Sequence, residues 1–431
     1  MLPHLSTARK GPLLEIERHI HAAQPDIEHW FRLQWQEHPA PFYTSVDLRN
    51  AGFKLAPVDA NLFPGGFNNL NPDFLPLALQ AAQVAVEKMC VSAKRFLIIP
   101  ENHTRNAFYL QNVATLANIM RKIGLSVRIG SLIPGLEAPL VLDLPDGGTL
   151  ILEPITRRGD RLLLRDRHGE PDFEPCAILL NNDLSAGVPE ILQGLSPAQG
   201  MLPPLHAGWH SRRKSQHFAA YDAMARQFAA LIGIDPWLIN PYHANCGEVD
   251  FHTRKGEDCL AGHVEEVLAR TRVKYREYGI GREPFVIVKA DAGTYGMGIM
   301  TVKSSDDVVE LNRRARNKMA VVKEGLAVHH VLVQEGVPTF ETMHEAVAEP
   351  VVYLIDHFVV GGFYRVHTGR RLDENLNAPG MHFVPLAFEE TGSFCDCSAE
   401  PDAPVNRFYT YGVIARLAAL AASLELERTA P

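Results

Sequence analysis

The stretch VKADAGTYGMGIMTV, residues 288–302, sets three glycines between two apolar runs. The residues after Gly298 alternate between apolar and polar side chains, a pattern that predicts a strand rather than a helix. We therefore expect an antiparallel hairpin with strands at residues 285–289 and 299–303. Dinucleotide-binding folds place their glycines between a strand and a helix, and the order G-T-Y-G-M-G also departs from G-x-G-x-x-G. The P-loop string G-x-x-x-x-G-K-[ST] does not occur either.

A hairpin with a glycine-rich tip has a precedent in kinase-like and grasp-type nucleotide sites. Glycines free the backbone N–H groups to close over phosphates, and Lys289 on the first strand would neutralise the phosphate charge. The alternative is an ordinary glycine hairpin with a surface lysine, and short glycine motifs alone do not separate the two.

The elements downstream favour the nucleotide site. The string VLVQEG predicts an apolar strand ending in Gln334 and Glu335, whose backbone can pair with adenine while the acid meets a ribose. A second predicted hairpin, residues 348–367, carries Glu349 and Arg365 near its ends. A lysine strand, a glycine flap, a strand ending in an acid and a hairpin with an arginine follow one another in ATP-grasp nucleotide sites.

The first half of the chain predicts a second unit. A buried strand at residues 96–99, a helix at 107–123 and a strand at 125–129 predict a parallel βαβ unit. Short apolar runs separated by Gly and Pro turns predict further strands between residues 139 and 180. We predict a mixed α/β protein with three parts: an N-terminal helical segment (1–40), an α/β substrate-binding domain (41–205) and an ATP-grasp-like nucleotide-binding domain (206–431). Further helices are predicted at residues 215–232, 260–278 and 411–426.

Composition limits the function. The chain has 431 residues, 46% apolar and 21% charged, and its 42 basic and 50 acidic residues give a net charge of -8. This balance argues against a nucleic-acid partner, which usually requires a concentrated basic surface. The amino terminus lacks the apolar core of a signal peptide, and no run approaches the ~20 apolar residues of a membrane span. We expect a cytoplasmic protein without a membrane partner.

Six irregularly spaced cysteines do not predict a disulfide framework. Cys395 and Cys397 could form a redox or metal pair, but no second Cys/His pair lies near them at zinc spacing, so a polar loop is favoured.

Several strings carry a family resemblance: VDANLFPGGFNNL, PENHTRNAFYLQN, GWHSRRKSQHF, DPWLINP and VKADAGTYGMGIMTV. They resemble the proteobacterial glutamate-cysteine ligase family with an ATP-grasp type carboxy-terminal half. The likeness covers residues 58–302 and continues more weakly to about residue 386. Several blocks are remotely similar to the eukaryotic type of glutathione synthetase.

The resemblance implies roles for residues that local sequence alone leaves open. Asp59, Asn61 and Asp291 would bind Mg²⁺, because the oxygens of Asp59 and Asn61 share one face of an extended segment. The alternatives are an Asx turn at Asn61 and a turn-capping role for Asp291. ATP would contact Lys214, Lys289, Gly293, Gly296, Gly298, Gln334, Glu335 and Glu349. Lys289 and Arg365 would be catalytic, and Arg49, Arg105, Asn106 and Arg365 would bind the amino-acid substrate, with Asn375 and Asn377 completing the phosphate or metal site. His103 is expected to be a hydrogen-bonded turn residue.

The implied reaction takes ATP, L-glutamate and L-cysteine. ATP would phosphorylate the γ-carboxylate of glutamate, and the amine of cysteine would displace phosphate to give γ-glutamylcysteine. Mg²⁺ and the lysines would spread the charge of phosphoryl transfer. Two alternatives remain open at this point: a glutathione synthetase or another amino-acid ligase of the same fold, and a nucleotide-binding module without catalysis.

Overall fold

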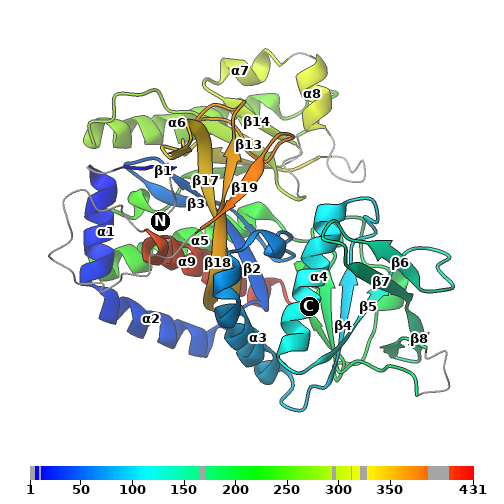
Figure 1. Cartoon of the computed structure of the whole chain (residues 1–431). Helices are drawn as coiled ribbons and strands as arrows, with labels where there is room; N and C mark the ends of the chain where they lie inside the picture. Colours follow the sequence, from blue (N-terminus) through cyan, green and yellow to red (C-terminus); the bar gives the residue numbers. More distant parts are fainter. Residues whose placement is uncertain are drawn as a thin grey trace.

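The computed structural model describes residues 5–8, 11–165, 171–247, 249–293, 298–311, 313–320, 328–386 and 407–431. It has a mixed α/β architecture, as the sequence predicts, and its strands form three larger sheets (Figure 1). The 3₁₀ helices in these ranges are Phe67–Asn69, Pro72–Phe74, Glu190–Leu192, Leu205–Ala207 and Pro236–Leu238. Across the described ranges, no helix is both long enough and apolar enough to cross a membrane.

A seven-stranded antiparallel sheet occupies the centre of the molecule. Its long strands β17 and β18 form the predicted hairpin, in which Glu349 pairs with Arg365. On its other side β17 pairs with β2, which places Val351 opposite Asp47. Strands from residues 41–205 and from residues 206–431 thus share one sheet. Its strands are β1 (Leu5–Ser6), β2 (Tyr43–Asn50), β3 (Leu55–Asn61), β16 (Thr342–Met343), β17 (Ala346–Ile355), β18 (Phe358–His367) and β19 (His382–Pro385).

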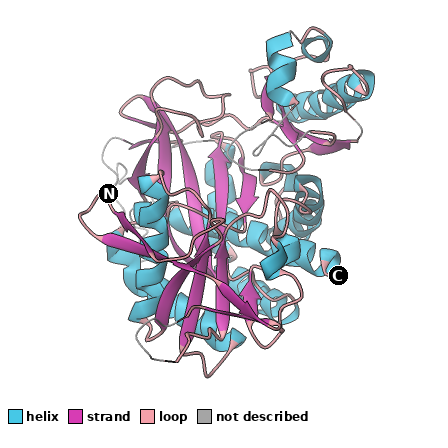
Figure 2. Ribbon diagram, turned by 90° about the vertical axis from the view of Figure 1, so that its right-hand side faces the viewer, coloured by secondary structure: helices cyan, strands magenta, loops and turns pink. Residues whose placement is uncertain are grey.

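Helices cover both faces of this sheet (Figure 2). One face packs against α9 (Phe408–Thr429), which is apolar on most sides and correspondingly buried. Behind α9 lies α5 (Lys214–Ile232), and the first residues fold into the predicted helices α1 (Pro12–Ala22) and α2 (Gln24–Glu37). The opposite face packs against α3 (Leu75–Met89). The helices hold the central strands rigidly in place from both sides.

The six-stranded sheet contains the predicted βαβ unit. Strand β4, helix α4 (Ala107–Lys122) and strand β5 form it, and the two strands pair in parallel. Strand β10 pairs in parallel with the other edge of β4, so the carboxyl ends of these strands meet at a point where the strand order reverses. The strands are β4 (Arg95–Pro100), β5 (Ser126–Ser131), β6 (Leu140–Asp143), β7 (Thr149–Pro154), β10 (Ala177–Asn181) and β11 (Gly200–Leu202); β8 (Thr156–Arg158) and β9 (Arg161–Leu163) pair separately.

The four-stranded sheet carries the glycine-rich hairpin. Strands β13 and β14 pair antiparallel, with Lys289 opposite Ile299, which confirms the hairpin prediction. Helix α6 (Glu257–Glu277) packs on this sheet, and the short helices α7 (Asp306–Val309) and α8 (Arg313–Met319) lie nearby (Figure 1). The strand order is β12 (His243–Cys246), β15 (Val331–Glu335), β13 (Val286–Ala290) and β14 (Ile299–Val302).

Candidate functional site

A cavity of about 760 Å³ is lined by the seven-stranded sheet, the four-stranded sheet and the turns after β4 and β10. The structure brings most of the predicted site residues to its wall: Arg49, Asp59, Asn61, Asn106, Lys214, Lys289, Gly293, Gln334, Glu335, Glu349, Arg365, Asn375 and Asn377. Arg105, Asp291 and Gly298 are not among the residues that line it, and Gly296 lies outside the described residues.

Lys289 lies at the junction of two sheets. Its Nζ donates to the carbonyl oxygen of Val58 at 2.7 Å and to Oε1 of Gln334 at 2.6 Å. Burial lowers the pKa of Lys289 to about 8, although the charge of Asp59 acts in the opposite direction. A bound anion would shift that pKa upward, because it favours the charged ammonium.

Asp59 lies beside a second lysine. Lys214 is the first residue of α5, and its Nζ donates to Oδ1 of Asp59 at 2.8 Å and lies 4.4 Å from the centre of the Trp209 ring. Desolvation opposes ionisation of Asp59, but Lys214 and Lys289 hold the pKa of this carboxyl below its usual value. The Asp59 side chain keeps 38% exposure, so an ionised carboxylate faces the cavity.

The other two predicted metal ligands, Asn61 and Asp291, already accept hydrogen bonds from the protein. Oδ1 of Asn61 accepts the N–H of Phe63 at 3.0 Å, which is the Asx-turn alternative. The Asp291 carboxylate accepts the N–H of Ser215 at 2.7 Å and its hydroxyl at 2.8 Å, so it caps the first turn of α5. Of the three residues, Asp59 is the one with a carboxylate exposed to the cavity.

Arg365 belongs to a chain of buried charges on three strands. Its Nη1 donates to Asp47 at 2.9 Å and to Glu349 at 2.6 Å, and Glu349 in turn accepts from Nε of Arg49 at 2.8 Å. Burial opposes the charge of Arg365, but Asp47 and Glu349 raise its pKa above the ordinary value. The rest of the Arg49 guanidinium donates to the carbonyl oxygens of Val337, Leu372 and Glu374. A substrate carboxylate at Arg49 would have to replace some of these bonds.

Three buried donors of residues in the cavity wall lack a hydrogen-bond partner among the described residues. They are Nε1 of Trp209, Nε of Arg365 and Nε2 of Gln334, whose Oε1 is already bound to Lys289. A buried donor without an acceptor costs about 1–3 kcal/mol, so a ligand oxygen at this position would be stabilised. The wall therefore fits a ligand rich in anionic oxygens, such as a polyphosphate.

The carboxylate of Glu335 is held by three donors, on the opposite face of β15 from the Gln334 side chain. It accepts from Nζ of Lys54 at 2.8 Å, from Nε1 of Trp237 at 3.0 Å and from the N–H of Tyr242 at 2.9 Å. Burial lowers the pKa of Lys54 to about 8, and Glu335 opposes that shift. This pair fastens the end of β15 to the turn between β2 and β3.

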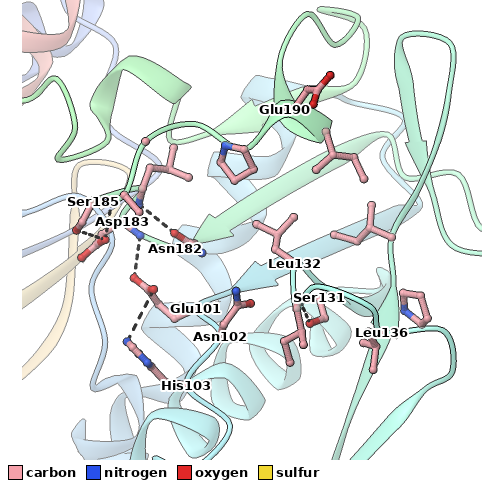
Figure 3. A pocket seen from close by; sticks show the side chains of 18 of the residues that line it. Glu101, Asn102, His103, Ser131, Leu132, Leu136, Asn182, Asp183, Ser185 and Glu190 are labelled. Carbon is pink, nitrogen blue, oxygen red and sulfur yellow. Dashed lines mark hydrogen bonds and ion pairs between the residues drawn. The ribbon is translucent and has the colours of Figure 1, made fainter. Parts of the chain in front are cut away.

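A second cavity of about 600 Å³ opens at the carboxyl ends of β4, β5 and β10 (Figure 3). Glu101 and Asp183 line both cavities, and a Glu101 oxygen accepts the N–H of Asp183 at 3.1 Å. Side chains of Leu132 and Leu136 supply an apolar wall.

Three of the residues singled out in the sequence lie in the turn after β4. Nε2 of His103 lies 3.8 Å from a carboxylate oxygen of Glu101. The hydrogen bond expected for His103 remains a prediction. Asn106 is the N-cap of α4, and its Oδ1 accepts the N–H of Tyr109 at 3.2 Å. Arg105 is exposed. The substrate roles of Arg105 and Asn106 remain predictions.

Sequence analysis missed Asp47, Lys54, Glu101 and Asp183. Asp47 could have been found, because it stands two residues before Arg49 and therefore on the same face of an extended strand. The others gain their significance from partners that lie far away in the chain, such as Glu335 for Lys54.

Buried lysines and arginines, a partly exposed carboxylate and Gly293 of the glycine-rich hairpin line one cavity, as expected of an enzyme that binds ligands with anionic oxygens. The chain belongs to the glutamate-cysteine ligase family, whose model "GshA: Glutamate-cysteine ligase" matches residues 17–426. The resemblance drawn from the sequence motifs is thereby confirmed, and with it a ligase that uses ATP on small-molecule substrates.

Solved structures agree with this assignment. A crystal structure from Methylobacillus flagellatus KT, named "Putative gamma-glutamylcysteine synthetase", is 64% identical and has a TM-score of 0.89 over 100% of this chain and 99% of that chain. A glutathione synthetase-like effector from Globodera pallida is 10% identical, with a TM-score of 0.36 over 83% of this chain and 78% of that chain. That similarity is too low to carry an argument. No curated protein matches the chain.

Proposed function

We propose that the larger cavity binds ATP, Mg²⁺ and L-glutamate and forms γ-glutamyl phosphate, which the amine of L-cysteine then attacks. A carboxylate is a poor electrophile, and phosphorylation gives it a leaving group. The observation that carries the proposal is that Lys214, Lys289, Gln334 and Asp59 line one cavity, in a chain of the glutamate-cysteine ligase family.

The lysines would bind the phosphates. Lys214 and Lys289 place two ammonium groups at the cavity, and the unpaired Nε2 of Gln334 adds a neutral donor among the described residues. The hairpin with Gly293, Gly296 and Gly298 would close over the phosphates as an ATP-grasp flap and exclude water from the acyl phosphate. In this proposal the four- and seven-stranded sheets enclose the nucleotide, and the six-stranded sheet belongs to the substrate domain of residues 41–205. The backbone of Gln334 and Glu335 would address the adenine.

Asp59 would be the main protein ligand of Mg²⁺. It remains ionised and exposed to the cavity, and Mg²⁺ commonly takes one or two carboxylates together with substrate phosphates. When bound, the metal would supply electrophilic stabilisation of the phosphoryl charge. Asn61 and Asp291 would act chiefly through the turn and the helix cap that position Asp59 and Lys214.

Arg365 would orient the γ-carboxylate of glutamate or the transferring phosphoryl group, because its Nε is buried at the cavity wall without a partner among the described residues. Glu349 and Arg49 would hold the guanidinium in place. The acceptor amino acid would enter from the second cavity, where the carboxylates Glu101 and Asp183 favour an ammonium group (Figure 3).

ADP release from the purified protein tests the proposal. The protein is supplied with ATP, Mg²⁺ and L-glutamate, with and without L-cysteine, and the product is identified by mass. We expect cysteine-dependent ADP and the mass of γ-glutamylcysteine. ADP formed only with γ-glutamylcysteine and glycine would make the protein a glutathione synthetase, and no ADP with any acceptor would favour a binding module.

A further inference from the structure

Two cysteines and a histidine meet outside both cavities, at the contact between β12 and α6. Cys246 is the last residue of β12, whereas Cys259 and His263 lie one turn apart on α6 and so project from the same side of the helix. One ligand atom from each residue lies within 4.8 Å of the other two, and the two Sγ atoms are 3.3 Å apart.

The sulfur separation fits a shared metal better than a disulfide. Tetrahedral Zn²⁺ with Zn–S bonds of ~2.3 Å would place two sulfurs roughly 3.8 Å apart, so the pair would open by about 0.5 Å. A disulfide of ~2.05 Å would require the sulfurs to close by more than twice that distance.

His263 also has a carboxylate beside its ring. Nδ1 of His263 lies 3.5 Å from the carboxylate of Glu266, three residues further along α6. A carboxylate at this position fixes the ring orientation and makes the imidazole a better ligand. Such a contact is an observation independent of the two sulfurs.

We propose that Cys246, Cys259 and His263 bind one Zn²⁺ ion that fastens helix α6 to the four-stranded sheet. Cys246 is buried, whereas Cys259 is exposed and His263 is partly exposed, so the ion has an entry path and a fourth position for water. Strand β12 pairs with β15, where His243 stands opposite Gln334. The ion would therefore stabilise the sheet that forms one wall of the nucleotide cavity, without touching that cavity. The proposal does not depend on the reaction proposed above.

Metal analysis of the full-length chain tests this site. The protein is purified without an affinity tag or chelator, dialysed against Zn²⁺ and measured by mass spectrometry for bound metal. We expect about one Zn²⁺ per chain in the wild type and in the matched control Cys90→Ser, whose cysteine lies at the end of α3. Cys246→Ser, Cys259→Ser and His263→Gln should each weaken binding at least tenfold, and Glu266→Gln about tenfold.

Cobalt substitution of the wild type keeps the test valid if a variant fails to fold. Two thiolate ligands should give strong thiolate-to-cobalt absorption in the near ultraviolet, which Cys90→Ser retains. Absence of that absorption would overturn the proposal. A Cys246–Cys259 disulfide found by peptide mapping in the Zn²⁺-treated protein would also overturn it. So would a Cys395→Ser/Cys397→Ser variant that loses the metal while Cys259→Ser keeps it.

Discussion

Replacing Lys289 with methionine isolates the ammonium group in the proposed phosphate site. The substitution keeps most of the side-chain length but removes a charge that contacts Val58 and Gln334 at 2.7 and 2.6 Å. Loss of one preorganised donor from a desolvated site typically reduces kcat by about 100- to 1,000-fold, or ~3–4 kcal/mol. We expect a loss of that order in kcat/KM for ATP, measured by ADP release.

Stability must be measured alongside activity. In the variant, the Val58 and Gln334 oxygens lose the ammonium donor, which costs about 1–3 kcal/mol of folding free energy for each unsatisfied buried group. The variant also no longer has to bury a charge, which offsets part of that cost. We therefore expect a net loss of no more than a few kcal/mol by urea unfolding. Lys303→Met is the matched control, because Lys303 follows β14 and its side chain is 64% exposed, with an ion pair to Asp373 at 3.3 Å. Folded Lys289→Met protein with more than half of the wild-type kcat/KM would refute the role of Lys289.

Four further predictions follow from the same contacts. The pKa of ligand-free Lys289 is about 8, and a bound phosphate raises it, so ATP binding without glutamate should take up a proton near pH 8–9. The affinity for ATP should therefore fall as the pH rises through about 8. Calorimetry in two buffers measures the proton uptake, and Lys289→Met should abolish it. Asp59→Asn should raise the Mg²⁺ concentration for half-maximal activity at least tenfold, and an unchanged Mg²⁺ titration would remove Asp59 as a ligand. Lys54→Met should lower the free energy of unfolding by about 3 kcal/mol, because the buried Glu335 carboxylate loses its counter-ion but keeps the donors of Trp237 and Tyr242, and a loss below about 1 kcal/mol would contradict this. Glu101→Gln should raise KM for cysteine several-fold with little change in KM for ATP, whereas an equal rise in both would argue against an acceptor site at the second cavity.

Local patterns predicted the elements that are defined by neighbours in the chain. The glycine hairpin of β13 and β14, the β4–α4–β5 unit and the β17–β18 hairpin each follow from alternation, apolar runs and turn residues within one continuous segment of the chain. The β2–β3 hairpin escaped prediction, since its strands carry charged residues whose partners lie in the second half of the chain. Asp47, for example, meets Arg365 318 positions away. No local periodicity reports such a pair.

The site residues divide in the same way. Sequence motifs singled out Lys214, Lys289 and Asp59, and the folded chain brings all three to one cavity. The motifs could not distinguish a polar residue that binds a ligand from one that hydrogen-bonds to the backbone. Asp291 illustrates the difference, because a metal ligand and a helix cap can use the same carboxylate oxygens. The sequence alone does not show that Ser215 occupies those oxygens.

The β2–β3 hairpin contacts both the proposed nucleotide side and the proposed glutamate side of the larger cavity. Its carbonyl at Val58 accepts from Lys289 of the four-stranded sheet, its turn contributes Lys54 to Glu335, and its Asp59 accepts from Lys214 of α5. The same hairpin carries Asp47 toward Arg365. Because the nucleotide side and the proposed glutamate side are both anchored here, a shift of this hairpin displaces both groups of residues together. The second cavity lies at the ends of a different sheet, and among the described residues it shares Glu101 and Asp183 with the first. Under the proposed roles, the acceptor site and the phosphate site are therefore built from different elements of the fold.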